Sequence, residues 1–315
     1  LAGEHFAPDE LCVITGDAEV GRAFVSMPFD HLLFTGSTAV GRQVAMAAAA
    51  NLTPVTLELG GKSPAILDPS CDLDAAASSI AYGKLLNAGQ TCIAPDYLLV
   101  PQGQAGTVAA KLATAIARLY PTLRDNPDYT AIVSDRHHQR LCEMIAEARD
   151  AGADVIEVNP AREQFGSTSR KLPPTLVKNP GSNLRLMREE IFGPVLPIVE
   201  YTTLDDAIDH VNRADRPLAL YWFGRDSGNR QRILRETVAG GVTINDCMLH
   251  LVQENQPFGG VGASGMGAYH GEWGFRTFSK EKPVFLQSRL SAGGLLRPPY
   301  GKTFERIFSL LRQIT

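Results

Sequence analysis

Short apolar runs alternate with amphipathic stretches along the whole chain of 315 residues. Apolar runs bounded by glycine, proline or asparagine predict buried strands, and apolar residues three or four positions apart predict helices. The predicted strands are residues 11–16, 31–36, 54–59, 64–68, 97–101, 153–158, 175–179, 196–201, 239–245 and 282–287. The predicted helices are residues 17–27, 37–50, 72–89, 107–120, 134–152, 203–214 and 229–238. Such alternation is typical of an α/β fold with parallel strand pairing.

Composition and charge narrow the class of protein. Hydrophobic residues make up 44% of the chain and charged residues 20%, which is ordinary for a globular protein, and the length suggests about two domains. The net charge is -4 without any block of basic residues, which argues against a nucleic-acid partner. No apolar run approaches the roughly 20 residues that cross a bilayer, so we expect no membrane span.

The cysteine pattern indicates the compartment. Five cysteines are scattered along the chain without any CxxC pair: Cys12, Cys71, Cys92, Cys142 and Cys247. An odd, scattered set argues against a disulfide framework and against a zinc site. It favours a reducing compartment, so we expect a cytoplasmic protein without a bound metal.

Cys92 stands between two turn-prone runs in the stretch NAGQTCIAPDY, residues 87–97. Gly89 and Gln90 precede the cysteine and Pro95 follows it. A lone cysteine is often a buried small hydrophobe. The alternative is a nucleophile, which needs an activating base and an oxyanion site. The cysteine alone leaves both interpretations open.

Two further segments could carry chemistry near strand ends. Residues 34–41, FTGSTAVG, form a predicted strand, a glycine turn and a helix start, whose free N–H groups could hold a phosphate. An ordinary strand-to-helix turn would have the same pattern. Glu58 ends a predicted strand and precedes a glycine pair, so it is either a solvated carboxylate or a general base with a raised pKa.

Residues 187–198, MREEIFGPVLPI, join the carboxylates of Glu189 and Glu190 to the ring of Phe192. This segment is either a surface loop that leads into a strand, or a contact for a sugar hydroxyl and an aromatic cofactor. Residues 260–265, GVGASG, satisfy G-x-G-x-x-G. They follow a loop and Pro257, and not a strand, so we interpret them as a chance match to the dinucleotide fingerprint.

Taken together and in order, five motifs resemble the NAD(P)-dependent aldehyde dehydrogenase family. They are FTGSTAVG, LELGGKSP, NAGQTCIAPDY, EEIFGPVLPI and PFGGVGASGMGAYHG. The segments TCIAPDY, INDCMLH and GMGAYHGEWGFRTFS look like the class 3 branch of the family. The segment RPPYGKTFERI near the C-terminus is most similar to the bacterial coniferyl aldehyde dehydrogenase group. The resemblance covers essentially the whole chain.

The resemblance implies the chemistry of the site. It implies that Cys92 is the nucleophile that attacks an aldehyde carbonyl, and that Glu58 is the base that activates water to hydrolyse the resulting thioester. An aldehyde has no leaving group until a hydride departs to a nicotinamide, so the two-step route is chemically sound. The backbone N–H of Cys92 could supply half of an oxyanion hole. The cofactor would be NAD or NADP, and the substrate a small-molecule aldehyde.

The resemblance also implies cofactor contacts and domains. The implied cofactor-binding residues are Gly36, Ser37, Thr38, Gly41, Leu59, Gly60, Glu190 and Phe192. Residues 1–58 would form the C-terminal part of a Rossmann-type dinucleotide-binding domain, and residues 59–266 the α/β catalytic domain. Residues 267–315 would form a C-terminal segment with an oligomerisation strand near residues 282–288. The resemblance also implies a homodimer, and a lone strand in this segment would need a partner edge, which another subunit could supply.

The chain departs from the family pattern at its start. Relatives carry a longer N-terminal segment that includes an asparagine of the oxyanion hole, and the sequence has no counterpart to it. We therefore expect an N-terminally truncated chain that is poorly soluble or inactive alone, since losing one oxyanion donor typically costs about 10² to 10³ in rate.

Two alternatives to an aldehyde dehydrogenase remain open. One is an esterase that uses the same thiol without a cofactor, and the other is a catalytically impaired relative that acts only as an interaction scaffold. Within the leading hypothesis, coniferyl aldehyde is the first expected substrate and a long-chain aliphatic aldehyde the second. The sequence does not choose between NAD and NADP.

Overall fold

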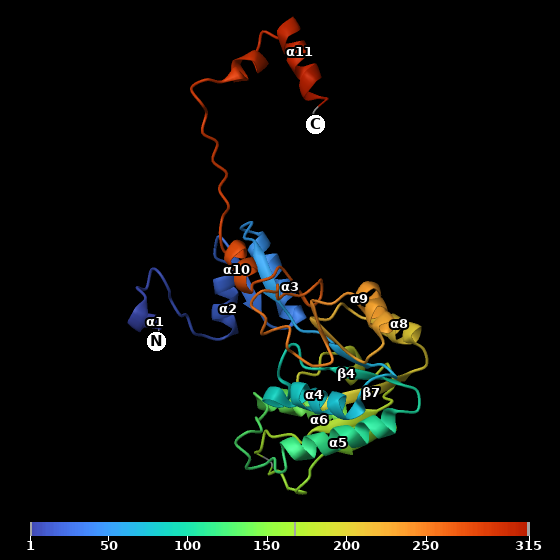
Figure 1. Ribbon diagram of the computed structural model, residues 1–315. Helices are drawn as coiled ribbons and strands as arrows, with labels where there is room; N and C mark the ends of the chain where they lie inside the picture. Colours follow the sequence, from blue (N-terminus) through green and yellow to red (C-terminus); the bar gives the residue numbers. More distant parts are fainter. Residues whose placement is uncertain (1, 167, 314–315) are drawn as a thin grey trace. The chain divides into compact units, whose positions relative to one another are not determined.

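The computed structural model describes residues 2–166 and 168–313 and divides the chain into two compact units, Leu1–Phe278 and Ser279–Thr315. The first unit contains two sheets (Figure 1). Among the described residues, no helix combines the length and the apolar character needed to cross a membrane.

A seven-stranded sheet is the centre of the first unit. Its strands lie in the order β5-β6-β7-β4-β3-β8-β9, and every neighbouring pair is parallel except β5 and β6. The strands are β5 (Asp154–Glu157), β6 (Thr175–Lys178), β7 (Val195–Tyr201), β4 (Tyr97–Pro101), β3 (Pro64–Leu67), β8 (Ala219–Phe223) and β9 (Gly241–Ile244). This confirms the predicted α/β class.

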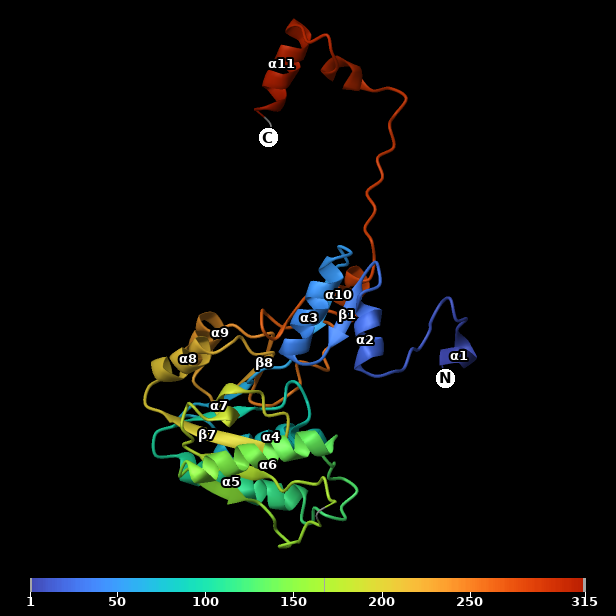
Figure 2. The same ribbon diagram turned by 180° about the vertical axis from the view of Figure 1, so that it is seen from behind.

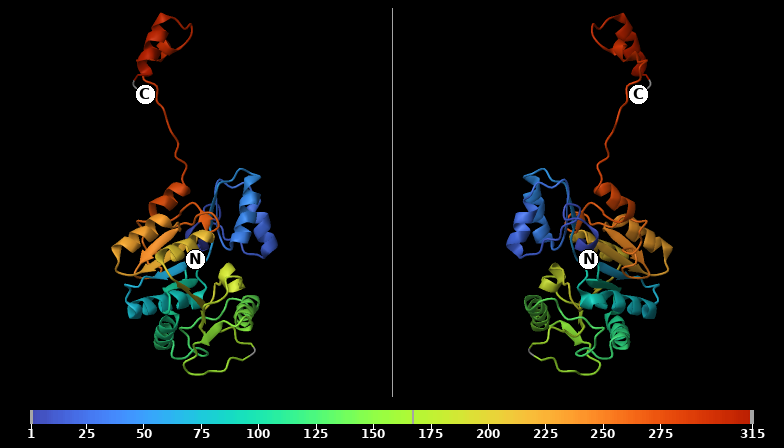
Figure 3. Two further views of the ribbon diagram at one scale, coloured as in Figure 1. Left: turned by 90° about the vertical axis from the view of Figure 1, so that its right-hand side faces the viewer. Right: turned by 90° about the vertical axis from the view of Figure 1, so that its left-hand side faces the viewer.

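Helices cover both faces of this sheet because its strands are apolar on both sides. In β3, Ala65 and Leu67 pack into the cluster that contains α4 (Leu73–Leu85) and α5 (Ala105–Leu119). Ile66, between them, packs on the opposite face with α8 (Leu204–Arg213) and α9 (Ser227–Glu236). α6 (Asp135–Asp150) covers that second face beside β6 and β7. Figure 3 shows helices on either side of the strands.

A smaller sheet joins segments from the two ends of the first unit. β1 (Leu32–Thr35) pairs in parallel with β2 (Val55–Glu58), and β10 (Gly265–Met266) pairs antiparallel to β2. α3 (Thr38–Ala49) packs on this sheet through Val44, and Ser37 caps its N-terminus. Figure 2 shows α2 (Ala18–Val25), α3 and α10 (Gly271–Thr277) beside β1. Asp17 caps α2, since its carboxylate accepts from the backbone N–H groups of Glu19 and Val20.

Two predicted strands do not form. Residues 11–16 carry no strand assignment and are exposed, and residues 282–288 likewise carry none. A strand is defined by pairing, and no described segment of this single chain pairs with either stretch. An apolar run is therefore insufficient evidence for a strand where no neighbouring edge is available.

Other elements were not predicted. β8, β10, α10 and α7 (Arg185–Arg188) were absent from the predicted strands and helices. Short elements of the chain are α1 (Ala2–His5) and the 3-10 turns η1 (Leu86–Gly89) and η2 (Ala292–Leu296). In the second unit, α11 (Lys302–Leu311) stacks the rings of Phe304 and Phe308 with centroids 5.6 Å apart.

Candidate active site

Glu58 is a buried carboxyl at the last position of β2. Its residue is only 3% exposed, and neither carboxylate oxygen has a hydrogen-bond partner among the described residues. Burial raises the pKa of Glu58 to about 8. Because unpartnered buried carboxylates are costly, this site is expected to serve a ligand or a reaction and not stability.

A sharp turn after α4 delivers Cys92. Asn87 and Ala88 have φ of 52° and 51°, so two successive left-handed residues reverse the chain within η1. The side chain of Gln90 holds this turn in place. Its Nε2 donates to the carbonyls of Asn87 and Ala131, each at 3.1 Å, and its Oε1 accepts from the N–H of Val133 at 2.8 Å.

The turn places the half-buried thiol of Cys92 where the carboxyl groups of Glu58 and Glu190 act on it. Burial, followed by the charges of Glu190 and Glu58, raises the pKa of the Cys92 thiol to about 11. The structure thus places the carboxyl of Glu58 close enough to Cys92 for its charge to act on the thiol. In the protein alone, the thiol is protonated at neutral pH.

Glu190 lies directly against the backbone of Gly60. A Cβ placed on Gly60 would come within 2.1 Å of both carboxylate oxygens of Glu190, so only glycine leaves room for that carboxylate. Burial, followed by the charge of Asp96, raises the pKa of Glu190 to about 7. Phe192, two residues further, has a φ of 52°, which is uncommon for an aromatic residue.

The glycine turn between β1 and α3 is exposed, and a few specific contacts hold it. Ser37 accepts from the N–H of Val40 at 3.4 Å, and Thr38 donates its hydroxyl proton to the carbonyl of Ala263 at 2.8 Å. A Cβ on Gly41 would lie 2.6 Å from Leu59. The side chain of Leu59 therefore packs against α3, and the remaining predicted residue, Gly36, has the ring of Phe34 over it.

Several charged residues of the site were not predicted. Lys62 and Asp96 form an almost completely buried ion pair, with side chains 11% and 4% exposed. Lys84 is also buried, and burial lowers the pKa of its ammonium to about 8. Each of these residues follows or interrupts an apolar run close to a recognised motif. A charged residue in such a position was the sequence signal that could have indicated a site residue.

Aromatic side chains gather near the same carboxyl and thiol. Phe258 stacks on His270 with centroids 4.9 Å apart, and the ring of Tyr269 meets His270 edge-on at 4.8 Å. Burial and the charges of Glu58 and Cys92 raise the pKa of Tyr269. The segment PFGGVGASGMGAYHG, which was singled out only as a family motif, thus contributes an aromatic wall.

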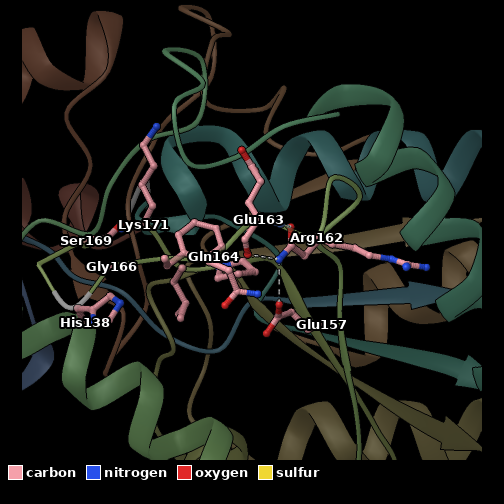
Figure 4. Close-up of a pocket in the computed structure, with 12 residues that line it drawn as sticks. His138, Glu157, Arg162, Glu163, Gln164, Gly166, Ser169 and Lys171 are labelled. Atoms are coloured by element: carbon pink, nitrogen blue, oxygen red, sulfur yellow. Dashed lines mark hydrogen bonds between the residues drawn. The ribbon is translucent and has the colours of Figure 1, made fainter.

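A separate cavity of about 540 Å³ lies beside α6 (Figure 4). None of the predicted site residues lines it. Glu163, in its wall, accepts from the N–H groups of Leu123 and Arg124, and Lys171 donates to the carbonyls of Leu123 and Asn126. These polar side chains hold the loop together, and we assign no ligand to the cavity.

Comparisons with known proteins identify the class. The model of the aldehyde dehydrogenase family matches residues 4–284. The chain belongs to the aldehyde dehydrogenase family, as its motifs predicted. The fold agrees: the substrate-bound AldH of Staphylococcus aureus superposes with a TM-score of 0.89 and 39% identity, over 98% of this chain and 66% of that chain. The NAD-dependent aldehyde dehydrogenase from Sinorhizobium meliloti has a TM-score of 0.78 and 30% identity, over 87% of this chain and 55% of that chain.

Similar proteins with names include coniferyl aldehyde dehydrogenases and a family 3 member. The probable coniferyl aldehyde dehydrogenase of Caulobacter vibrioides is 52% identical over 97% of this chain and 64% of its own length. The coniferyl aldehyde dehydrogenase of a Pseudomonas species is 48% identical over 99% of this chain and 65% of its own length. Aldehyde dehydrogenase family 3 member A2 of Mus musculus is 42% identical over 91% of this chain and 58% of its own length. The chain therefore spans less than two thirds of the length of these relatives.

Proposed function

We propose that the protein oxidises an aldehyde to the carboxylic acid with NAD or NADP, using Cys92 as the nucleophile and Glu58 as the base. The observation that carries this proposal is the half-buried thiol of Cys92 under the influence of the buried, unpartnered carboxyl of Glu58. A structural role explains neither the orphaned carboxylate nor the left-handed turn that delivers the cysteine.

The residues present fit a dinucleotide. The Glu190 carboxylate, which lies over the buried Gly60, is suited to hold a ribose hydroxyl, and Phe192, two residues further along the chain, offers a ring. The N-terminus of α3, with Gly36, Ser37, Thr38 and Gly41, is suited to a pyrophosphate. The remaining predicted contact, Leu59, lies at the end of β2. When bound, the nicotinamide supplies the acceptor for the hydride of the substrate.

The protein's own groups carry the other steps. The thiol of Cys92 passes its proton to the carboxylate of Glu58 as its sulfur forms a C–S bond to the aldehyde carbon, and Glu58 releases that proton to solvent. The C=O π electrons move to the oxygen, and the Cys92 N–H is available to that developing oxyanion. After the substrate has lost its hydride, a thioester to Cys92 remains. Glu58 then takes a proton from water as that water attacks the thioester, the acid departs, and the thiolate of Cys92 returns. A pKa of about 8 suits Glu58 to this role near neutral pH.

For the substrate, we propose an aromatic aldehyde of the coniferyl type, with a long-chain aliphatic aldehyde as the second candidate. The aromatic wall of Phe258, Tyr269 and His270 supports the first choice, as do the names of the two bacterial relatives. We further propose that residues 1–58 belong to the dinucleotide-binding domain, residues 59–266 to the catalytic domain and residues 267–315 to an oligomerisation segment. The protein would act in the cytoplasm as a homodimer.

The test measures formation of reduced cofactor from coniferyl aldehyde by the protein purified from its native source and by its Cys92→Ala variant. We expect formation by the wild type and none by the variant. Normal turnover by Cys92→Ala would refute the assignment. Cleavage of an activated ester that is indifferent to added NAD, without aldehyde oxidation, would instead identify a thiol esterase.

A further inference from the structure

The segment that carries Glu190 and Phe192 is held almost entirely by side chains from elsewhere in the fold. Lys62 donates to the carbonyl of Glu189 at 3.1 Å, and Asp96 accepts from the N–H of Ile191 at 2.9 Å. From the other side, Arg140 donates to two carbonyls and His137 to a third. We call these four residues, Lys62, Asp96, His137 and Arg140, the clamp.

Arg140 of α6 makes a forked contact. One guanidinium N–H group donates to the carbonyl of Ile191 at 3.0 Å, and the other donates to the carbonyl of Glu190. The same guanidinium lies 3.7 Å from the carboxylate of Glu189. A planar fork can satisfy two consecutive carbonyls at once, which a lysine ammonium cannot do in the same geometry.

His137, one turn before Arg140, holds the next residue of the segment. Its Nε2 lies 2.7 Å from the carbonyl oxygen of Phe192, which only accepts, so the ring donates there. The two rings also meet edge-on, with centroids 5.9 Å apart. These contacts act on the residue whose φ of 52° lies in the left-handed region, which is strained for a bulky side chain.

The clamp also connects this segment to the nucleophile. Asp96 lies four residues after Cys92, and its backbone N–H donates to the carbonyl of Ser63 at 2.7 Å. Its carboxylate pairs with Lys62, whose ammonium reaches the carbonyl of Leu186 at 2.7 Å. The loop of Cys92 and the segment of Glu190 are thus fixed to one another through a buried ion pair.

We propose that Arg140, assisted by His137, is a positioning residue for hydride transfer. The clamp holds residues 189–192 in the strained conformation that presents Glu190 and Phe192 to the nicotinamide half of the cofactor, at a set place relative to Cys92. This inference rests on the proposed function, because it assigns the cofactor to Glu190 and Phe192. It adds that α6, which contributes no group to the reaction, governs how fast the hydride is transferred.

The test compares Arg140→Lys with Arg149→Gln, an exposed arginine in the last turn of the same helix. Arg140→Lys keeps the charge and loses the fork. We expect the single-turnover rate of reduced-cofactor formation to fall about tenfold or more, since small displacements of reacting groups are costly. The KM for the cofactor should rise several-fold, while the KM for the aldehyde and the alkylation rate of Cys92 by iodoacetamide stay unchanged. Arg149→Gln should match the wild type in all four quantities.

Two further measurements keep the inference falsifiable. Backbone amide hydrogen exchange, measured without cofactor, should be faster in residues 189–192 of Arg140→Lys than in the wild type. This measurement does not require an active enzyme. His137→Phe, which keeps a ring against Phe192 but loses the donor, should change the rates in the same direction. Equal single-turnover rates for Arg140→Lys and Arg149→Gln would overturn the inference, as would a parallel loss of Cys92 alkylation, which indicates general loosening. A wild type that forms no reduced cofactor would instead overturn the proposed function.

Discussion

The carboxylate of Glu190 rests on the α-carbon of Gly60, where a Cβ would come within 2.1 Å of both of its oxygens. The backbone of Gly60 does not require glycine, since its φ lies outside the left-handed range. The requirement is therefore the space that Glu190 occupies. This contact links the end of β2, next to Glu58, with the segment that precedes β7.

Gly60→Ala should displace the Glu190 carboxylate without straining the backbone. We expect the KM for the cofactor to rise about tenfold, with a smaller effect on the KM for the aldehyde, measured by steady-state kinetics with each substrate varied. Gly106→Ala is the matched control, because Gly106 lies in α5 with nothing within 4 Å of an added Cβ. An unchanged cofactor KM in Gly60→Ala would argue against Glu190 as a cofactor contact.

Glu58→Gln should stall the reaction after hydride departure. The amide keeps the shape of the carboxyl but cannot take a proton from water, so we expect hydrolysis to slow about 10²-fold or more. Intact mass measurement after mixing with aldehyde and cofactor should then reveal the acyl group on Cys92. Because the pKa of Glu58 is about 8, the wild-type hydrolysis rate should rise with pH up to about 8. A Glu58→Gln variant that turns over normally would contradict this assignment.

The same carboxyl should make folding stability depend on pH. Its folded-state pKa of about 8 exceeds the ordinary value of 4.5, so the folded protein binds more protons than the unfolded chain between these values. Stability contributed by this group is therefore full below pH 4.5 and is lost as pH rises to about 8, by at most ~5 kcal/mol. Urea unfolding at pH 6 and pH 9 should show a smaller loss for Glu58→Gln than for the wild type. Equal losses would mean that Glu58 titrates normally.

Local patterns predicted much of the fold. Most strands and helices were found because a buried strand needs an apolar run and a helix needs apolar residues at its own spacing, both of which are local requirements. The segment 11–16 has the same apolar pattern and forms no strand, because pairing depends on a distant edge. The order of strands, and the return of β10 to pair with β2, likewise depend on contacts between residues far apart in the sequence.

The residues of the candidate site differ in whether a sequence motif contains them. Cys92 and Glu58 lie in motifs, and the fold brings them together. The clamp was missed because its bonds are tertiary: Lys62 reaches the carbonyl of Glu189 across 127 positions, and Arg140 reaches that of Ile191 across 51. A motif shows which residues are present, but only the fold shows which carbonyl a guanidinium reaches.

His250 should weaken the fold in acid. It is a buried histidine whose Nδ1 lies 2.8 Å from the hydroxyl of Thr243, and burial lowers its pKa to about 4. The unfolded chain, with a pKa of 6.5 here, binds more protons between pH 6.5 and 4, so stability falls as pH drops through that window, by up to ~3 kcal/mol. Urea unfolding at pH 7 and pH 5 should show a smaller decline for His250→Gln than for the wild type. The exposed His5→Gln control should decline as the wild type does.

The proposed homodimer depends on a segment that is apolar and uncovered in the single chain. Val284, Phe285 and Leu286 are 79%, 86% and 91% exposed, which is unusual for three consecutive large hydrophobic residues. Pairing of this extended segment with a sheet edge of a second copy would bury them and satisfy its backbone. Phe285→Asp should raise the dimer dissociation constant about 30-fold or more, as measured by sedimentation equilibrium. Ser291→Asp introduces the same charge six residues later. Its carboxylate can replace the serine hydroxyl as the cap of η2, so this variant should leave the dimer intact. Equal dissociation constants for both variants would locate the dimer contact elsewhere in the chain.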